Sequence, residues 1–275
     1  MLKAVILDMN RGEENRSIPM LYAILKGYAN DLTFDHLDIR LKHEIPALEY
    51  DIYLFSGGPG MPLEPNEPWW QPLNQLILDL WEHNRTADLE GKTKKFVFFI
   101  CHSFQIACNC FGLAQITERQ KMSFGTFPVH KTHDGKDEAL FMPLSDPFYI
   151  ADFRKYQVVQ PDRARFYEMG AKILCLEKLR PHVHHERAIM AIRFSPEMIG
   201  TQFHPEANPE GMLMHFQQSH RRESVVETYG EARYDRMIRD LYNPDKIRHT
   251  FDTIIPLFLK DAVHELRLAE LALSE

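Results

Sequence analysis

Short apolar runs alternate with helical patterns in the first part of the chain, and this alternation constrains the fold more than any other feature. The runs are KAVILD (3–8), DIYLF (51–55) and KKFVFFI (94–100), and LTFDHLDI (32–39) suggests a further strand. A run that is apolar at nearly every position is typical of a strand buried on both faces of a parallel sheet. We therefore predict an α/β fold with a doubly wound, mostly parallel sheet flanked by helices. In such sheets ligands bind outside the carboxyl ends of the strands.

The pattern changes twice along the remaining chain. Residues 113–203 are richer in β patterns, and the residues after 206 are mainly helical. We expect one α/β domain over residues 1–215 and a helical C-terminal extension over residues 216–275. The helices of the extension are expected at EARYDRMIRDLY (231–242) and HTFDTIIPLFLKDAVHELRLAELAL (249–273), with Pro244 between them.

Composition excludes several classes of protein. Of 275 residues, 44% are hydrophobic and 26% are charged, which is ordinary for a globular protein. The formal charge of -7 gives no electrostatic reason to expect nucleic acid or an anionic membrane as a partner. The N-terminal run MLKAVILDMN meets Asp8 at once, so it is interpreted as a buried strand and not a signal peptide. Four cysteines in a chain of this length do not make a disulfide framework, and a cytoplasmic location is expected.

Cys101 ends the run FVFFI, and a helical pattern resumes directly after it. It could be a buried cysteine used for packing, which is the commoner case, or a nucleophile on a sharp strand-to-helix turn. The turn SGGPG (56–60) follows the neighbouring apolar run and lets a ligand approach its backbone amides. It lacks the Gly-Lys-Ser/Thr of a phosphate loop.

A His-Pro-Glu unit closes the segment GTQFHPE (200–206). Pro205 keeps His204 extended, and residues two apart on an extended segment project to the same side. His204 and Glu206 are therefore predicted to lie side by side, where a carboxylate can orient an imidazole and stabilise its protonated form.

Taken together, these stretches make the sequence similar to the class I glutamine amidotransferases, including the glutaminase domain of GMP synthase. The family's glycine turn is present at 56–60, its Gly-x-Cys-x-Gly-x-Gln elbow is matched in part at 99–105, and its Gly-x-Gln-Phe-His-Pro-Glu segment is present in full at 200–206. FGTFPV (124–129) resembles a family segment that shapes the glutamine pocket. The resemblance implies a flavodoxin-like architecture and no cofactor.

The resemblance also implies a chemistry for the triad. Cys101 would attack the side-chain amide of L-glutamine, His204 would move the protons, and Glu206 would hold His204 in position. Ammonia would go to an acceptor on a separate subunit or in the extension.

Four further residues are implied to bind substrate or the oxyanion. Backbone amides of His102 and of Gly57 or Gly58 would meet the oxyanion, and Gln105 belongs to the same pocket. The helical extension and the loop carrying Trp69 and Trp70 are candidates for docking a partner. The C-terminal helices could also form a homo-oligomer.

The chain departs from the family at three places. Phe99 and Ser103 stand where the elbow has glycines, and DFRKYQVVQP (152–161) replaces a loop that usually carries a Ser-His pair. Two alternatives therefore stay open: hydrolysis of another γ-glutamyl amide by the same triad, and a binding or regulatory domain that has lost turnover.

One cluster suggests a metal. In HVHHE (182–186), His182 and His184 could share one face of a strand, with His185 and Glu186 nearby. Nothing upstream offers matching ligands, so no metal site is predicted.

Overall fold

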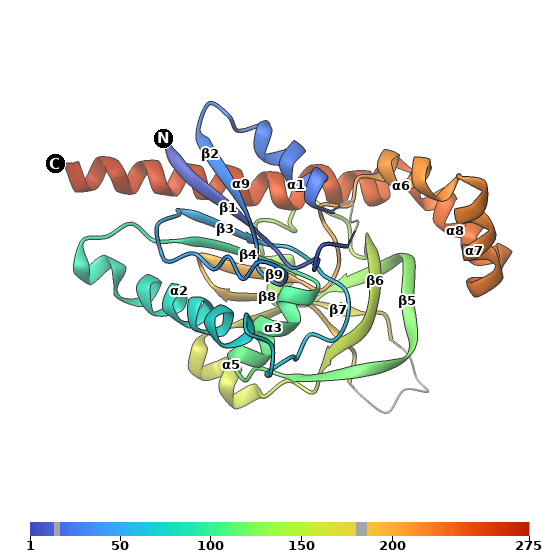
Figure 1. The fold of residues 1–275 in the computed structure, drawn as a ribbon, viewed down its shortest axis with the longest axis horizontal. Helices are drawn as coiled ribbons and strands as arrows, with labels where there is room; N and C mark the ends of the chain where they lie inside the picture. The colour runs from blue at the N-terminus through green and yellow to red at the C-terminus, as the bar shows by residue number, and fades with distance from the viewer. Residues whose placement is uncertain (14–16, 180–185, 275) are drawn as a thin grey trace.

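A computed structural model describes residues 1–13, 17–179 and 186–274. In this part of the chain the strands form one sheet of nine, in the order β2-β1-β3-β4-β9-β8-β7-β5-β6 (Figure 1). The strands are β1 Leu2–Asp8, β2 Leu32–Asp38, β3 Ile52–Phe55, β4 Phe96–Ile100, β5 Gln115–Lys131, β6 Phe148–Val159, β7 Lys172–Glu177, β8 Ile189–Ser195 and β9 Met198–Thr201.

The sheet is mixed. Strands β2, β1, β3, β4 and β9 pair in parallel, whereas β9, β8, β7, β5 and β6 pair in antiparallel fashion. The prediction of a mostly parallel, doubly wound sheet is therefore not confirmed beyond its first half. The physical reason is the β-rich segment after residue 113, whose connections are too poor in long helices to make parallel crossovers. The segment 152–161, expected as a loop, lies mostly within β6.

The helices are α1 Ser17–Lys26, α2 Trp70–Glu90, α3 His102–Cys110, α4 His133–Lys136, α5 Arg163–Met169, α6 Pro209–Phe216, α7 Ser219–Tyr229, α8 Glu231–Tyr242 and α9 His249–Ser274, with a short π-helical turn, η1, at Pro244–Arg248. The expected helix at 231–242 and the expected break at Pro244 are confirmed. None of the described helices combines the length and the apolar character that a membrane span needs.

Two hydrophobic clusters cover opposite faces of the sheet. Ala4 and Ile6 of β1 face α1 and α9, whereas Val5 and Leu7 face α2 and α3. In Figure 1, α9 runs the length of the molecule on one side of the sheet, and α2, α3 and α5 lie on the other. Such alternation explains why β1 is apolar at consecutive positions.

The C-terminal helices fall into two groups. Helix α9 packs into the core of the sheet, where Phe258 contacts the rings of Phe96 and Phe98. Helices α6 to α8 form a third cluster against β5 and β6, with Met237 and Phe216 in its interior. The division of the chain at residue 215 stays a prediction, but α9 buries the same face of the sheet as α1.

The packing at the centre of the sheet can be tested at Gly200 of β9. An added methyl group would lie 2.7 Å from the ring of Phe104 and 3.1 Å from Cβ of Phe99, both fully buried. We expect Gly200→Ala to lower the free energy of unfolding by about 1–3 kcal/mol, as overpacked cores do, in urea denaturation.

The control is Gly170→Asn. Gly170 has φ of +68°, and a Cβ atom added there would have no neighbouring atom within 4 Å. Asn tolerates such a conformation at a helix end. A Gly200→Ala protein as stable as this control would contradict the packing.

Candidate active site

Cys101 lies on a sharp turn between β4 and α3. Its backbone angles, φ 50° and ψ −95°, are rare for a residue other than glycine, and such strain gathers at functional sites. The side chain is 5% exposed, and its backbone N–H donates to the carbonyl oxygen of Thr201 at 2.7 Å. The predicted strand-to-helix turn is therefore present, directly beside the end of β9.

The two elbow positions that lack glycine are accommodated by their surroundings. Phe99 is fully buried against the rings of Phe55 and Phe194, and it pairs across the sheet with Gly200, which has no side chain to compete for the space. The Ser103 hydroxyl accepts a hydrogen bond from the Ile100 amide at 2.9 Å and has carbonyl acceptors within 3.0 Å. Neither substitution closes the turn.

His204 and Glu206 are side by side, as the extended His-Pro-Glu unit predicts. Nδ1 of His204 lies 2.7 Å from Oε1 of Glu206, which is 1% exposed. The Ser17 hydroxyl, at the start of α1, donates to the same oxygen at 2.5 Å. Because Nδ1 is held by the carboxylate, Nε2 is the imidazole atom left to exchange protons with another group.

The environment of His204 favours its charged form. Burial alone would lower the pKa of His204, but the negative charges of Glu206 and Cys101, together with hydrogen bonds to both, raise it well above its usual value. Glu206 and Cys101 thus both stabilise the protonated form of the imidazole.

His102 has the opposite environment. Burial, with a smaller effect from the charge of Arg40, lowers the pKa of His102 to about 3. Its side chain is therefore neutral at physiological pH, and its ring does not serve as an acid there. Its backbone amide is in the first turn of α3, where N–H groups have no acceptor within the helix.

The glycine turn fits against both Cys101 and His204. A side chain at Gly57 would come within 2.7 Å of Cε1 of His204 and 3.5 Å of Cβ of Cys101, so only glycine leaves room there. Gly58 lies against the carbonyl of Met9, and the Ser56 hydroxyl accepts a hydrogen bond from the Met9 amide at 2.9 Å. The turn is fixed to the end of β1 in this way.

Gln105 reaches the cysteine through a second glutamine. Its Nε2 donates to Oε1 of Gln202 at 3.0 Å and to the carbonyl of Tyr156 at 3.2 Å. Nε2 of Gln202 lies 3.7 Å from Sγ of Cys101. Gln105 is 3% exposed, and its side-chain amide is already hydrogen-bonded to Gln202 and Tyr156. It therefore contacts Cys101 only through Gln202.

Two contributors to the site, Ser17 and Gln202, were given no role in the sequence analysis, although Gln202 lies within the GTQFHPE motif. Gln202 could have been found, because it stands two residues before His204 on the same extended segment. Ser17 has the local pattern of a helix cap, and nothing near it indicates that it contacts a residue 189 positions away.

The proline-dense loop is packed against the body of the protein. Trp69 and Trp70 are 1% and 7% exposed and belong to the same cluster as α2. Arg40 lies over the Trp69 ring and donates to the carbonyl of Pro59 and to Glu64. These tryptophans therefore offer little surface to a docking partner.

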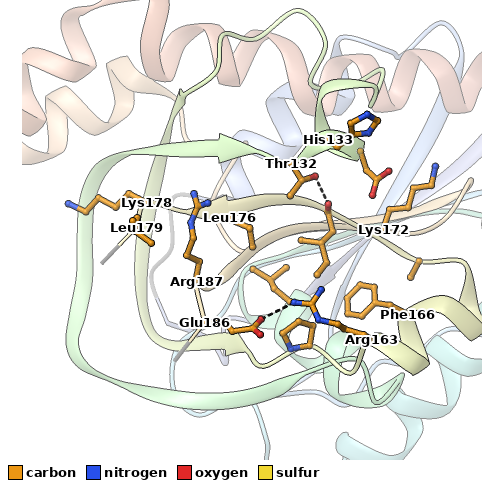
Figure 2. Close-up of a pocket in the computed structure, with 15 residues that line it drawn as sticks. Thr132, His133, Arg163, Phe166, Lys172, Leu176, Lys178, Leu179, Glu186 and Arg187 are labelled. Atoms are coloured by element: carbon orange, nitrogen blue, oxygen red, sulfur yellow. Dashed lines mark hydrogen bonds and ion pairs between the residues drawn. The ribbon is translucent and has the colours of Figure 1, made fainter. Parts of the chain in front are cut away.

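A cavity of about 780 Å³ lies elsewhere, between β7, α5 and the start of β8, and none of the triad residues lines it. In Figure 2, Arg163 and Glu186 form an ion pair in its wall. Its lining includes Leu179 and Glu186. His182, His184 and His185 of the HVHHE cluster lie outside the described residues. Within the described part of the chain, no group of three or more His, Cys, Asp or Glu side chains could hold a metal ion.

Comparison with known proteins shows which family the chain belongs to. The model of the family "Glutamine amidotransferase class-I" matches residues 24–220. A search of curated proteins finds no match.

Solved structures share the fold. A glutamine amidotransferase from Thermotoga maritima has a TM-score of 0.67 at 15% identity, over 95% of this chain and 98% of that one. A Thermoplasma acidophilum protein described as part of a GMP synthase has a TM-score of 0.51 at 18% identity, over 75% and 85%. The glutaminase domain of a Trypanosoma brucei CTPS, with bound acivicin, has a TM-score of 0.53 at 12% identity, over 75% and 86%.

The electrostatic role of Glu206 can be measured directly. We expect Glu206→Gln to lower the pKa of His204, because the carboxylate charge that raises it is gone while burial remains. NMR titration of the imidazole, assigned with His204→Gln, reads the pKa. Glu210→Gln, which removes an exposed carboxylate on α6, is the matched control and should leave the pKa unchanged.

The same shift has a consequence for stability. The pKa of His204 is raised in the folded state, so protonation of His204 stabilises the fold. This contribution to the free energy of unfolding is fully present below pH about 6.5 and is lost as pH rises through the folded pKa. Glu206→Gln should weaken this pH dependence, because only the contribution of Cys101 then opposes the effect of burial. If the pKa of His204 were the same in Glu206→Gln as in the unmodified protein, the proposed effect of Glu206 on His204 would be contradicted.

Proposed function

The chain belongs to the class-I glutamine amidotransferase family, and we propose that it hydrolyses the side-chain amide of glutamine through a thioester on Cys101 and releases ammonia for an acceptor. The observation that carries the proposal is the convergence of Cys101 with the His204–Glu206 pair at the ends of neighbouring strands. It supplies a nucleophile, a proton carrier and a group that orients the carrier.

In the first half-reaction, the sulfur of Cys101 attacks the amide carbon of glutamine. Nε2 of His204 carries the proton of the thiol, and the imidazolium gives it to the nitrogen as the carbon–nitrogen bond breaks. Ammonia leaves, and a γ-glutamyl thioester remains on Cys101. Glu206 keeps Nδ1 occupied throughout, which fixes the orientation of the ring.

In the second half-reaction, water attacks the thioester carbon. His204 takes a proton from the water, the carbon–sulfur bond breaks, and glutamate is released as Cys101 is restored. The raised pKa of His204 supports this exchange, since it favours the imidazolium that protonates the leaving nitrogen.

The negative oxygen of each tetrahedral intermediate would be met by backbone amides. His102 supplies one from the first turn of α3, and Gly57 or Gly58 supplies another from the fixed glycine turn. Removal of one such donor typically costs a few kcal/mol, about 3, in transition-state stabilisation. The main-chain origin of these donors means that their positions depend on the turns and not on side-chain identity.

The ammonia acceptor belongs to the same proposal. Two structural relatives are described as a CTPS glutaminase domain and as part of a GMP synthase, so delivery of ammonia to a synthase is the hypothesis we adopt. A separate synthase chain would dock near the mouth of the site, with helices α6 to α8 as the neighbouring surface (Figure 1).

The proposal is tested by glutamine turnover. We expect purified protein to release ammonia and glutamate from L-glutamine, and Cys101→Ala to reduce the rate by at least about a thousandfold, as loss of a nucleophile does. Cys110→Ala, on the same helix but away from the turn, is the control and should keep the rate.

Two results would redirect or overturn the proposal. Turnover of γ-glutamyl anilides without turnover of glutamine would favour the γ-glutamyl hydrolase alternative, for which the segment 152–161, in place of a loop with a Ser-His pair, is the reason. A rate that survives in Cys101→Ala would contradict the assignment of the nucleophile.

A further inference from the structure

A groove of about 540 Å³ lies between α8, β5 and β6, outside the triad. We call it the α8 groove, and define it by Thr126, Arg233, Arg236, Arg239, Asp240 and Lys246. Its size is in the range of pockets that hold small molecules, roughly 300–1,000 Å³.

The α8 groove is positively charged although the chain as a whole carries a formal charge of -7. Arg233, Arg236 and Arg239 are spaced three residues apart, which puts them along one face of α8. None of the three has a carboxylate partner among the described residues. Like charges at this spacing repel one another, so an anion bound beside the row would relieve the repulsion.

The one carboxylate of the described lining is already neutralised. Asp240 is buried, accepts a hydrogen bond from the Thr126 hydroxyl at 2.7 Å, and pairs with Nζ of Lys246 at 2.6 Å. It therefore holds Lys246 in the wall of the groove and does not pair with the arginines.

Aromatic rings position two of the cations. The guanidinium of Arg233 lies 4.8 Å from the centroid of Phe127, and the ammonium of Lys246 lies 4.0 Å from the centroid of Tyr149. One face of each ring is thus covered by a cation of the protein itself. Burial and, to a smaller extent, the charge of Arg236 lower the pKa of Arg233, in keeping with like charges held together.

The α8 groove begins close to the active site. The His204 amide donates to the carbonyl of Ala151 on β6, and Ala151 pairs with Thr126 on β5. Two strand spacings of about 4.8 Å each put Thr126 roughly 10 Å from the His204 backbone. A molecule bound in the groove would be a neighbour of the triad without occupying it.

We propose that the α8 groove binds a small molecule bearing phosphate groups. The planar guanidinium presents paired donors that match a phosphate, and three guanidinium groups in a row suit more than one negative charge. The volume of the groove fits a small molecule better than a folded partner. Binding does not require the nucleophile, so Cys101→Ala should bind as well as the unmodified protein.

The test is calorimetric titration with inorganic pyrophosphate at constant ionic strength. We expect Arg236→Ala/Arg239→Ala to weaken binding by about tenfold or more, since each exposed arginine supplies charge-assisted hydrogen bonds. The matched control, Arg221→Ala/Lys260→Ala, removes the same charge from exposed positions on α7 and α9 and should bind as the unmodified protein does.

Three outcomes overturn the proposal: no binding of pyrophosphate, equal weakening in both double variants, or binding of a hexaglutamate peptide in place of pyrophosphate. The last would assign the α8 groove to an acidic protein segment. Thermal melting of each variant shows that the fold is intact, because all four substituted side chains are exposed.

Discussion

The hydrogen bond from the Cys101 amide to the Thr201 carbonyl, at 2.7 Å, is the contact on which the site depends. It continues the parallel pairing of β4 with β9, in which Ile100 lies opposite Thr201. Because both strands end at this point, the residues that follow them meet, although they are far apart in the sequence. Gln202 then reaches Sγ of Cys101, and His204 follows two residues later. The antiparallel strands β5 to β8 serve this arrangement by returning the chain so that β9 runs beside β4.

Much of this could be predicted from local sequence. The runs that form β1, β3 and β4 are apolar at nearly every position, and α8 has a clear helical period, so the type of each element could be predicted. Cys101, His204, Glu206 and the glycine turn could be found because each lies in a short motif at a strand end. The antiparallel direction of the strands after residue 113 was missed, although the short connections between them, which are poor in long helices, favour it. The contact of Ser17 with Glu206 and the burial of Trp69 depend on segments that are distant in the sequence.

The pKa values of two histidines near Cys101 are shifted in opposite directions. Glu206 and Cys101 keep the pKa of His204 high, whereas burial beside Arg40 keeps that of His102 low. Environments that drive the pKa values of two titratable groups apart suit them to different roles, which is why we propose that His204 carries the proton and that His102 contributes its backbone amide. The α8 groove adds a second electrostatic feature, since it gathers positive charge about two strands away from this pair.

The measurement that tests the central claim most directly is intact-mass spectrometry after treatment with a diazo-ketone analogue of glutamine. Burial raises the pKa of the thiols of Cys108 and Cys175 well above the usual value and that of Cys110 to about 11, so these cysteines should stay unreactive at neutral pH. The account predicts a single adduct that is absent in Cys101→Ala and suppressed by excess glutamine. An adduct on another cysteine, or none on Cys101, would contradict it and return Cys101 to a packing role.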